Sequence, residues 1–286
     1  MPQALLATVR LIARSQNPIV RLAKRATTTV LHRVDVVARA RLSTGGVLYV
    51  DLGNAVGRTI WLRGDYSAEE PVVNLVASIL RTSDVFFDVG ANVGFFSLLA
   101  ARIVGQTGQV HSFEPLPKLA GLLRRTVVAN ALTNMTVVEA VVGKVEGASS
   151  MAAMPDSAYS HVMEGARTID EGHGGWTRLV VRSVTLDNYV ERVVRRPPRL
   201  IKMDIEGSEV DAIDGARRTL SHVNGPDVIC EVGNKHLSRF GHTPSELFDR
   251  FTVMGFEAVN PKTGLPMRVA DLSEHDYNVF FKKLRR

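Results

Sequence analysis

Cysteine is nearly absent from this chain, since Cys230 is the only one among its 286 residues. A disulfide framework within the chain is therefore excluded, and such cysteine usage is typical of a reducing compartment. Cys230 lies in the apolar run 228–230, which predicts a core position rather than a nucleophile. We expect a cytoplasmic protein.

Long apolar runs are also missing. Arginines interrupt the hydrophobic stretches near the N-terminus, so no segment there qualifies as a signal peptide or a membrane span. The chain has no internal repeat and no low-complexity tract. Its 45% hydrophobic and 22% charged residues fit one large soluble α/β domain, which we expect over residues 46–286, behind an N-terminal extension.

Acidic residues are scarce at the N-terminus, where residues 1–41 hold eight Lys or Arg and only one acid, Asp35. Several arginines share one helical face opposite apolar residues, and Asn17-Pro18 divides the segment into two helices. We therefore expect residues 1–45 to form a basic amphipathic helical extension. Packing of its apolar face on the domain, or on a second subunit of a homodimer, is slightly favoured over peripheral contact with an anionic membrane.

The remaining pattern alternates strands and helices, which predicts a doubly wound, mostly parallel sheet. Residues 46–62 predict a small hairpin that turns near Gly53, and residues 143–177 have weak periodicity typical of a lid-like insertion. We expect strands at 84–89, 109–114, 135–142, 178–184, 199–204, 227–232, 256–260 and 277–282, and helices at 69–81, 93–104, 116–130, 185–194, 207–220 and 244–254.

The most informative segment begins at Asp84, where an apolar strand ends in an acid and a glycine-rich turn leads into a helical pattern. About twenty-five residues later, a second apolar run ends in another acid. A glycine turn followed by a carboxylate at the next strand's end is how doubly wound domains hold an adenosine ribose. The pattern predicts a nucleoside cofactor bound by Asp88, Gly90, Asn92, Gly94, Glu114 and Pro115.

The G-x-G-x-x-G pattern of dinucleotide sites is absent, and Asp88 would lie where pyrophosphate oxygens belong. Like charges there are unfavourable, whereas the same acid suits the cationic ammonium and sulfonium of S-adenosyl-L-methionine. Glu114 could then accept hydrogen bonds from both ribose hydroxyls, each worth about 1.5–3 kcal/mol. S-adenosyl-L-methionine is therefore the predicted cofactor.

A second group of charges follows the strand at 199–204. Lys202, Asp204 and Glu206 alternate along it and would share one side, which is costly unless they emerge at the carboxyl end, where open α/β sheets bind ligands. Glu231 and His236 end the adjacent strand and could face the same crevice. We expect the general base among Asp204, Glu231 and His236, in a crevice that Lys202 and Glu206 line as substrate-binding residues.

Metal-ligand spacings of the H-E-x-x-H or C-x-x-C kind are absent, which argues against zinc. Asp204 and Glu231, with Asn234 nearby, could instead offer oxygen ligands to Mg²⁺, which would acidify a hydroxyl. The residues favour metal-free catalysis over this arrangement.

With these motifs the sequence resembles the FkbM family of S-adenosylmethionine-dependent O-methyltransferases, over about residues 70–235. The resemblance implies a class I methyltransferase (Rossmann-like) sheet, whose last strand runs antiparallel between two earlier ones. It also implies methylation of a hydroxyl on a small molecule, sugar or secondary metabolite, and the basic extension is compatible with a glycolipid acceptor. The residues that carry it are Asp88–Gly94, Phe113–Pro115, Asn130, Val184–Asp187, Ile201–Glu209 and Glu231.

Two other functions stay open from the residues. The basic extension is compatible with a nucleic-acid methyltransferase, although the Asn/Asp-Pro-Pro-aromatic motif of base aminomethylation is missing where this chain has residues 202–206. A cofactor-binding scaffold without catalysis would also keep Asp88 and Glu114, so these two acids do not discriminate.

Overall fold

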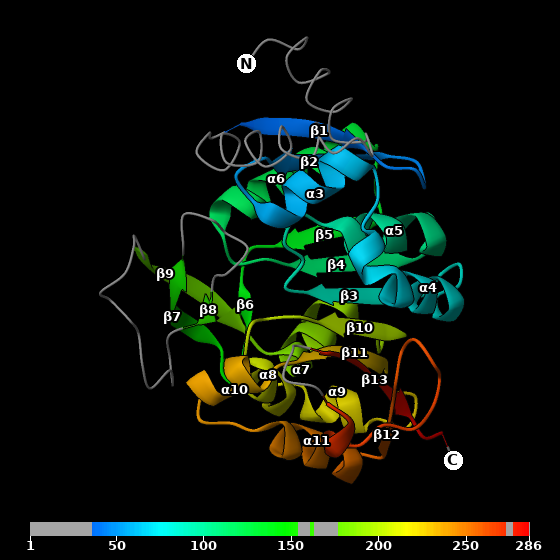
Figure 1. Ribbon diagram of the computed structural model, residues 1–286, viewed down its shortest axis with the longest axis vertical. Coiled ribbons are helices and arrows are strands. Elements are labelled where there is room, and N and C mark those ends of the chain that lie inside the picture. The colour runs from blue at the N-terminus through cyan, green and yellow to red at the C-terminus, as the bar shows by residue number, and fades with distance from the viewer. Residues whose placement is uncertain (1–35, 154–160, 163–176, 273–276, 286) are drawn as a thin grey trace, which may run out of the picture.

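The computed structural model describes residues 36–153, 161–162, 177–272 and 277–285, and its main body is a seven-stranded sheet flanked by helices (Figure 1). The predicted helical extension therefore falls mostly on residues 1–35, outside the described residues, as do its expected membrane and subunit contacts. Within the described ranges, no helix has the length and apolar character needed to cross a membrane.

The strand order confirms the predicted sheet. The last strand, β13, lies antiparallel between β11 and β12, while the neighbours from β11 to β5 all pair in parallel. This is the class I methyltransferase arrangement that the resemblance implies. In order across the sheet, the strands are β12 (Phe256–Val259), β13 (Tyr277–Lys283), β11 (Asp227–Val232), β10 (Leu200–Met203), β3 (Val85–Val89), β4 (Gln109–Phe113) and β5 (Met135–Val138).

Alternation along β3 builds two apolar cores, one on each face of the sheet. Phe86 packs in a cluster with residues of α4 (Glu70–Ile79), α5 (Phe95–Val104) and α6 (Pro117–Ala129). Phe87 points to the opposite face, into a cluster with residues of α8 (Glu209–Asp214) and α11 (Pro244–Val253). Because successive strand side chains face opposite sides, a strand covered on both faces is mostly apolar, and Asp88 is the exception in β3.

The predicted hairpin at 46–62 is wrong. The hairpin lies earlier, between β1 (Val37–Arg41) and β2 (Val47–Asp51), and turns through Gly45 and Gly46 at φ values of 87° and 90°. Asn54, which follows Gly53 at the expected turn, instead caps helix α3 (Ala55–Arg63), because its side-chain oxygen accepts the Gly57 N–H at 2.8 Å. Residues 37–41 are also a strand rather than part of a helical extension.

Asn130 at the end of α6 holds this hairpin against the domain. Its side chain accepts the Val47 N–H at 2.9 Å and donates to the Val47 carbonyl oxygen at 2.7 Å. The side-chain amide thus pairs both backbone groups of Val47 at the start of β2, while β1 pairs with the strand on its other edge.

A second sheet of four strands stands beside the main one (Figure 1). The predicted strand 135–142 is divided between the two, because β5 joins the main sheet and β6 (Val141–Val142) joins the second. The expected lid at 143–177 contributes β7 (Gly147–Ala153) and β8 (His161–Val162), which pair beside β9 (Thr177–Val184), and the rest of the lid lies outside the described residues.

Several helices differ from expectation in their bounds. The predicted helix 207–220 is two helices, α8 and α9 (Arg217–Ser221), broken at Gly215, where a side chain would meet the Gly143 carbonyl oxygen at 2.0 Å. The helix after Thr185 starts as α7 (Leu186–Tyr189) and continues as a π-helical turn, Val190–Val194. Helix α10 (Asn234–Arg239) was not predicted.

Gly90, just after β3, lies very close to the backbone that follows β10. Its φ is 82°, and a side chain there would meet the Asp204 carbonyl oxygen at 1.9 Å.

We expect Gly90→Ala to destabilise the protein by more than about 2 kcal/mol, because it adds both a left-handed backbone penalty and a clash with backbone. Gly121→Ala, in helix α6 with open space around it, is the control and should stabilise by about 0.5–1 kcal/mol. Urea unfolding of both variants measures this, and a native-like midpoint for Gly90→Ala would contradict the close approach.

Candidate active site

A pocket of about 340 Å³ opens at the carboxyl ends of β3, β4, β10 and β11. The strand order reverses between β3 and β10, and such switch points are where open α/β sheets bind ligands. Met151 of β7 also lines the pocket, so the second sheet forms part of its wall. Of the predicted site residues, those that line the pocket are Asp88, Gly90, Asn92, Glu114, Pro115, Lys202, Asp204, Glu206, Glu231 and His236.

Gly94 is the predicted site residue that the pocket does not include. It precedes α5 with a φ of 83°, and a side chain there would meet Leu123 of α6 at 2.2 Å. Its place in the structure is therefore a close contact between two helices rather than a wall of the pocket.

The turn after β3 is fixed to the end of β4. The N–H groups of Gly90 and Ala91 both donate to the Phe113 carbonyl oxygen, at 3.0 and 2.9 Å. Asn92, at a φ of 50°, donates its N–H to Glu114 at 2.9 Å. These bonds set the turn and the Glu114 carboxylate at a fixed separation.

Glu114 is buried, with 5% of its surface exposed, and it also accepts the Leu116 N–H at 2.9 Å. Burial raises the pKa of Glu114 to about 7, although its two backbone hydrogen bonds oppose the rise. The carboxyl group therefore changes its charge near neutral pH while its position is held by backbone on both sides.

Asp88 is 1% exposed and lacks a full set of partners. Its Oδ2 accepts the Ser97 hydroxyl at 2.5 Å, and Ser97 in turn accepts the Ser112 hydroxyl at 2.7 Å. Its Oδ1 is buried without a hydrogen-bond partner among the described residues. Burial raises the pKa of Asp88, and the nearby Lys202 opposes that shift. A buried acceptor left open in a pocket indicates that a ligand or water supplies the donor.

Lys202 lies within a buried strand and has partners there for its charged group. It pairs in register with Asp88, its Nζ donates to Asp204 at 2.7 Å, and it lies 4.9 Å from the centre of the Phe96 ring. Burial alone would lower the pKa of Lys202, but the carboxylates of Asp204 and Asp88 raise it above its ordinary value. The ammonium group therefore stays charged and is already engaged by Asp204.

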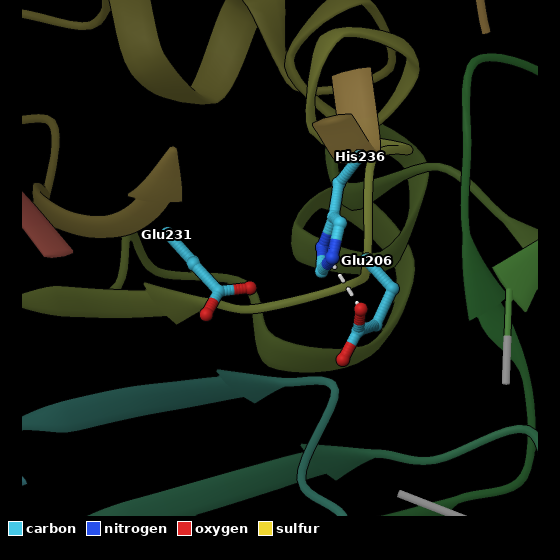
Figure 2. Close-up of side chains that lie close together, drawn as sticks. All are labelled: Glu206, Glu231 and His236. Carbon is cyan, nitrogen blue, oxygen red and sulfur yellow. Dashed lines mark ion pairs between the residues drawn. The ribbon is translucent and has the colours of Figure 1, made fainter. Parts of the chain in front are cut away.

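Four side chains form what we call the carboxylate–histidine cluster: Asp204, Glu206, Glu231 and His236. His236 Nδ1 lies 2.9 Å from Glu206 Oε2, and Figure 2 shows Glu231 facing this pair from β11. Glu231 shares a side-chain hydrogen bond with Asp204, and the Asp204 charge together with burial raises the pKa of Glu231 well above its ordinary value. Asp204, held by Lys202, has its pKa lowered although burial opposes this, so a proton between the two acids resides on Glu231.

Ligand atoms of Glu206, Glu231 and His236 all lie within 4.8 Å of one another. The grouping shares only Glu231 with the predicted magnesium set of Asp204, Glu231 and Asn234. Asn234 is exposed at the first residue of α10 and does not line the pocket. The other two members of the group are His236, two residues further along α10, and Glu206 from the loop after β10.

Glu209 was not predicted as a site residue, but it shapes the loop that carries Glu206. It is buried at the start of α8, where its Oε1 accepts the Ile205 N–H at 3.1 Å and the Gly207 N–H at 3.2 Å. Glu206 between them has a φ of 59°, and a side chain on Gly207 would meet the His236 carbonyl oxygen at 2.4 Å. The loop and α10 are therefore in direct contact.

Sequence reasoning also missed Tyr66, Glu69 and Phe96, which line the pocket. The Tyr66 ring meets Phe96 edge-on at 6.4 Å, and burial raises the pKa of Glu69, which accepts the Asn278 side-chain N–H at 2.9 Å. Phe96 lies within the glycine-turn segment and could have been found there. Tyr66 and Glu69 precede α4 and carry no motif, so only the fold brings them to the site.

The chain matches known proteins in both sequence and structure. The family described as "Methyltransferase FkbM domain" matches residues 88–258. The hexuronic acid methyltransferase AglP of Haloferax volcanii is 25% identical over 165 residues, which cover 58% of this chain and 63% of the relative, so the match spans less than two thirds of the relative's length.

Two solved structures are similar at lower identity. The methyltransferase FkbM from Methylobacillus flagellatus is 19% identical, with a TM-score of 0.45, over 92% of this chain and 59% of that one. A SAM-dependent O-methyltransferase from Thermotoga maritima is 14% identical, with a TM-score of 0.41, over 87% of this chain and 78% of that one.

Burial of Glu209 predicts a pH dependence of stability. Burial raises its pKa to about 7 from 4.5, against its hydrogen bonds, so its favourable contribution to folding is complete below pH 4.5 and is lost as pH rises to about 7. Glu209→Gln keeps an oxygen for both N–H groups but cannot ionise. Between pH 4.5 and pH 7.5, the free energy of unfolding of this variant should rise by up to about 3 kcal/mol relative to that of the native protein. Urea unfolding at four pH values measures the difference, and a constant difference would contradict the assigned burial.

Proposed function

We propose that this chain, which belongs to the FkbM methyltransferase family, transfers the methyl group of S-adenosylmethionine to a hydroxyl oxygen of a sugar-containing acceptor. One observation carries the proposal: a single pocket holds Asp88 and Glu114 on one side and the carboxylate–histidine cluster on the other, with Lys202 between them. Cofactor and acceptor can therefore meet at the strand ends.

Asp88 and Glu114 would hold the cofactor. Each Glu114 oxygen accepts one backbone N–H and keeps a further lone pair, which suits the two hydroxyls of a ribose. The open Oδ1 of Asp88 suits the cofactor's ammonium group, whose positive charge compensates a carboxylate that is costly to bury alone. When bound, S-adenosylmethionine supplies a methyl group on a positively charged sulfur.

The protein's first task is to hold three atoms in line: acceptor oxygen, methyl carbon and sulfur. Such positioning supplies about 7–11 kcal/mol in favourable intramolecular models. The close approach of the Gly90 turn to Asp204, together with the backbone bonds to Glu114, fixes the cofactor side relative to the acceptor side. A rigid turn here would therefore contribute directly to rate.

The protein's second task is to remove the hydroxyl proton, because an aliphatic hydroxyl is a poor nucleophile. Removing it adds about 10²–10⁴-fold in rate. We assign this task to the carboxylate–histidine cluster, in which Glu206 orients the His236 ring and Glu231 faces both. Lys202 keeps Asp204 charged and positions it beside Glu231, rather than extending to the acceptor.

The similarity to AglP supports a sugar-containing acceptor, because AglP is a hexuronic acid methyltransferase and matches 58% of this chain. The pocket supports a polyhydroxylated ligand, since Tyr66 and Glu69 bring a phenol and a carboxyl group to its wall beside the ring of Phe96. Aromatic faces and hydrogen-bonding groups together fit the apolar and polar sides of a sugar ring.

Removing the Glu114 charge tests the cofactor side. We expect Glu114→Gln to weaken S-adenosylmethionine binding at least 10-fold, because charge-assisted hydrogen bonds to the ribose are lost. With its pKa raised to about 7, native Glu114 becomes protonated as pH falls from 8 to 6, so native affinity should also fall over that range while the variant changes little. Titration calorimetry measures both, with Glu139→Gln, at a surface ion pair with Arg124, as the control. Equal affinities for Glu114→Gln and the control would refute the ribose contact.

Product analysis tests the reaction itself. Native protein incubated with cofactor carrying a deuterated methyl group and with a cell extract should label a sugar-containing compound on oxygen, as mass spectrometry detects. Glu231→Ala and His236→Ala should lose at least 100-fold in product while binding the cofactor normally, since proton removal is their assigned role. His242→Ala, at a partly buried pair with Glu246 of α11 that lies outside the pocket, is the matched control. Unchanged product from both cluster variants rules out the assigned acceptor side, and label on nucleic acid rules out the acceptor class.

A further inference from the structure

We propose that Glu206, Glu231 and His236 bind a divalent first-row transition-metal ion, such as Mn²⁺, and that this ion holds the acceptor's oxygen. Metal binding stands on the geometry alone, whereas its part in methyl transfer rests on the proposed function.

The three ligands come from separate elements and converge on one space. Glu206 follows β10, Glu231 lies in β11 and His236 lies in α10, yet their ligand atoms are all within 4.8 Å of one another (Figure 2). Small side-chain rotations would bring atoms at that spacing to coordination distances of about 2.0–2.2 Å. The three side chains are each partly buried, so the space they enclose is sheltered yet open to the pocket.

Ser208 is a second, independent sign that something binds beside these ligands. Its side chain is 4% exposed, lines the same pocket, and has a hydroxyl without a hydrogen-bond partner among the described residues. Buried hydroxyls are normally satisfied by protein, water or ligand. Because Ser208 is two residues from Glu206, a metal-bound water or acceptor oxygen is a suitable partner.

The charge balance of the pocket also calls for a cation. Lys202 is the only lysine or arginine that lines the pocket in the described part of the chain, and its Nζ donates to Asp204. Glu206 and Glu231 therefore share this region with the imidazole of His236. Two acids this close in a partly buried site can both be ionised only with a compensating positive charge, which a bound metal ion would supply.

The backbone around the ligands is set before any ion binds. Glu209 fixes the loop through its bonds to the Ile205 and Gly207 N–H groups, and Gly207 lies directly against the carbonyl group of His236. Glu206 and His236 are thus held by a loop and a helix that contact each other, while Glu231 lies on β11, inside the sheet. Such preorganisation lowers the cost of gathering ligands around an ion.

The donor set selects the class of metal. Mg²⁺ and Ca²⁺ take oxygen ligands, whereas an imidazole suits transition metals and carboxylates suit Mn²⁺ among them. Three protein ligands leave coordination positions open, which is typical of catalytic sites. The acceptor's hydroxyl oxygen would take one of these positions.

Metal binding would change how the acceptor is activated. The coordinated hydroxyl becomes more acidic, its O–H bond breaks, and the proton passes to a water molecule in the pocket. The oxygen then uses its electron pair to form the new bond to the methyl carbon. The carbon–sulfur bond breaks at the same time, and its electron pair returns to sulfur, which becomes neutral.

Binding of Mn²⁺ to the full-length protein, first treated with a chelator and then freed of it, tests the site without reference to activity. Paramagnetic resonance should show one bound ion per chain with coupling to a nitrogen nucleus, which identifies the imidazole ligand. Glu206→Gln, Glu231→Gln and His236→Ala should each weaken binding at least 10-fold, and His236→Ala should abolish the nitrogen coupling. His242→Ala provides the matched control, because His242 forms a similar pair with Glu246 at 2.9 Å outside the pocket.

The outcomes separate this inference from the proposed function. Two results would overturn the metal site. In one, the native protein binds the cofactor but takes up no Mn²⁺. In the other, the cluster variants bind Mn²⁺ as tightly as the native protein does. If the protein takes up no Mn²⁺ and methyl transfer survives chelation, the proposed function stands, with His236 as the base. Tight Mn²⁺ binding without any methyl transfer would instead refute the proposed function and keep the metal site.

Discussion

The ammonium group of Lys202 is the interaction on which the rest of the pocket depends. It lies in a buried strand, in register with Asp88, and donates to Asp204 beneath the ring of Phe96. Without that charge, carboxylates at the ends of two neighbouring strands would repel one another in a region shielded from water. The lysine also divides the pocket, because Glu114 follows β4 on one side of β10 and Glu231 lies in β11 on the other.

This division assigns different tasks to similar groups. Glu114 is held between two backbone N–H donors, so its oxygens keep a constant position for a ligand's hydroxyls. Glu231, by contrast, lies beside Asp204 and near Glu206 and His236, where we propose proton removal or a metal ion. Identical side chains thus differ through burial and neighbours, which is how, in the proposed function, one pocket would bind a charged cofactor and activate a neutral hydroxyl.

Much of the fold follows from periodicity and from motifs at strand ends. The alternation of Lys202, Asp204 and Glu206 indicates which charges emerge together, although β10 ends at Met203 and a left-handed turn carries Glu206 towards His236. That turn depends on Glu209 bonding to backbone, which no periodicity reveals. The misplaced hairpin has a similar cause, because Asn54 is equally suited to a turn and to a helix cap. Tyr66 reaches the pocket only through tertiary packing, so its sequence position carries no signal.

A crystal structure with S-adenosylhomocysteine, the demethylated form of the cofactor, tests the central claim most directly. The account predicts that the ribose hydroxyls lie within hydrogen-bonding distance of Glu114 and the amino group beside Asp88. It also predicts that the sulfur faces the space enclosed by Glu206, Glu231 and His236. Density for the ribose on the acceptor side of Lys202, or a sulfur directed away from that space, would contradict it.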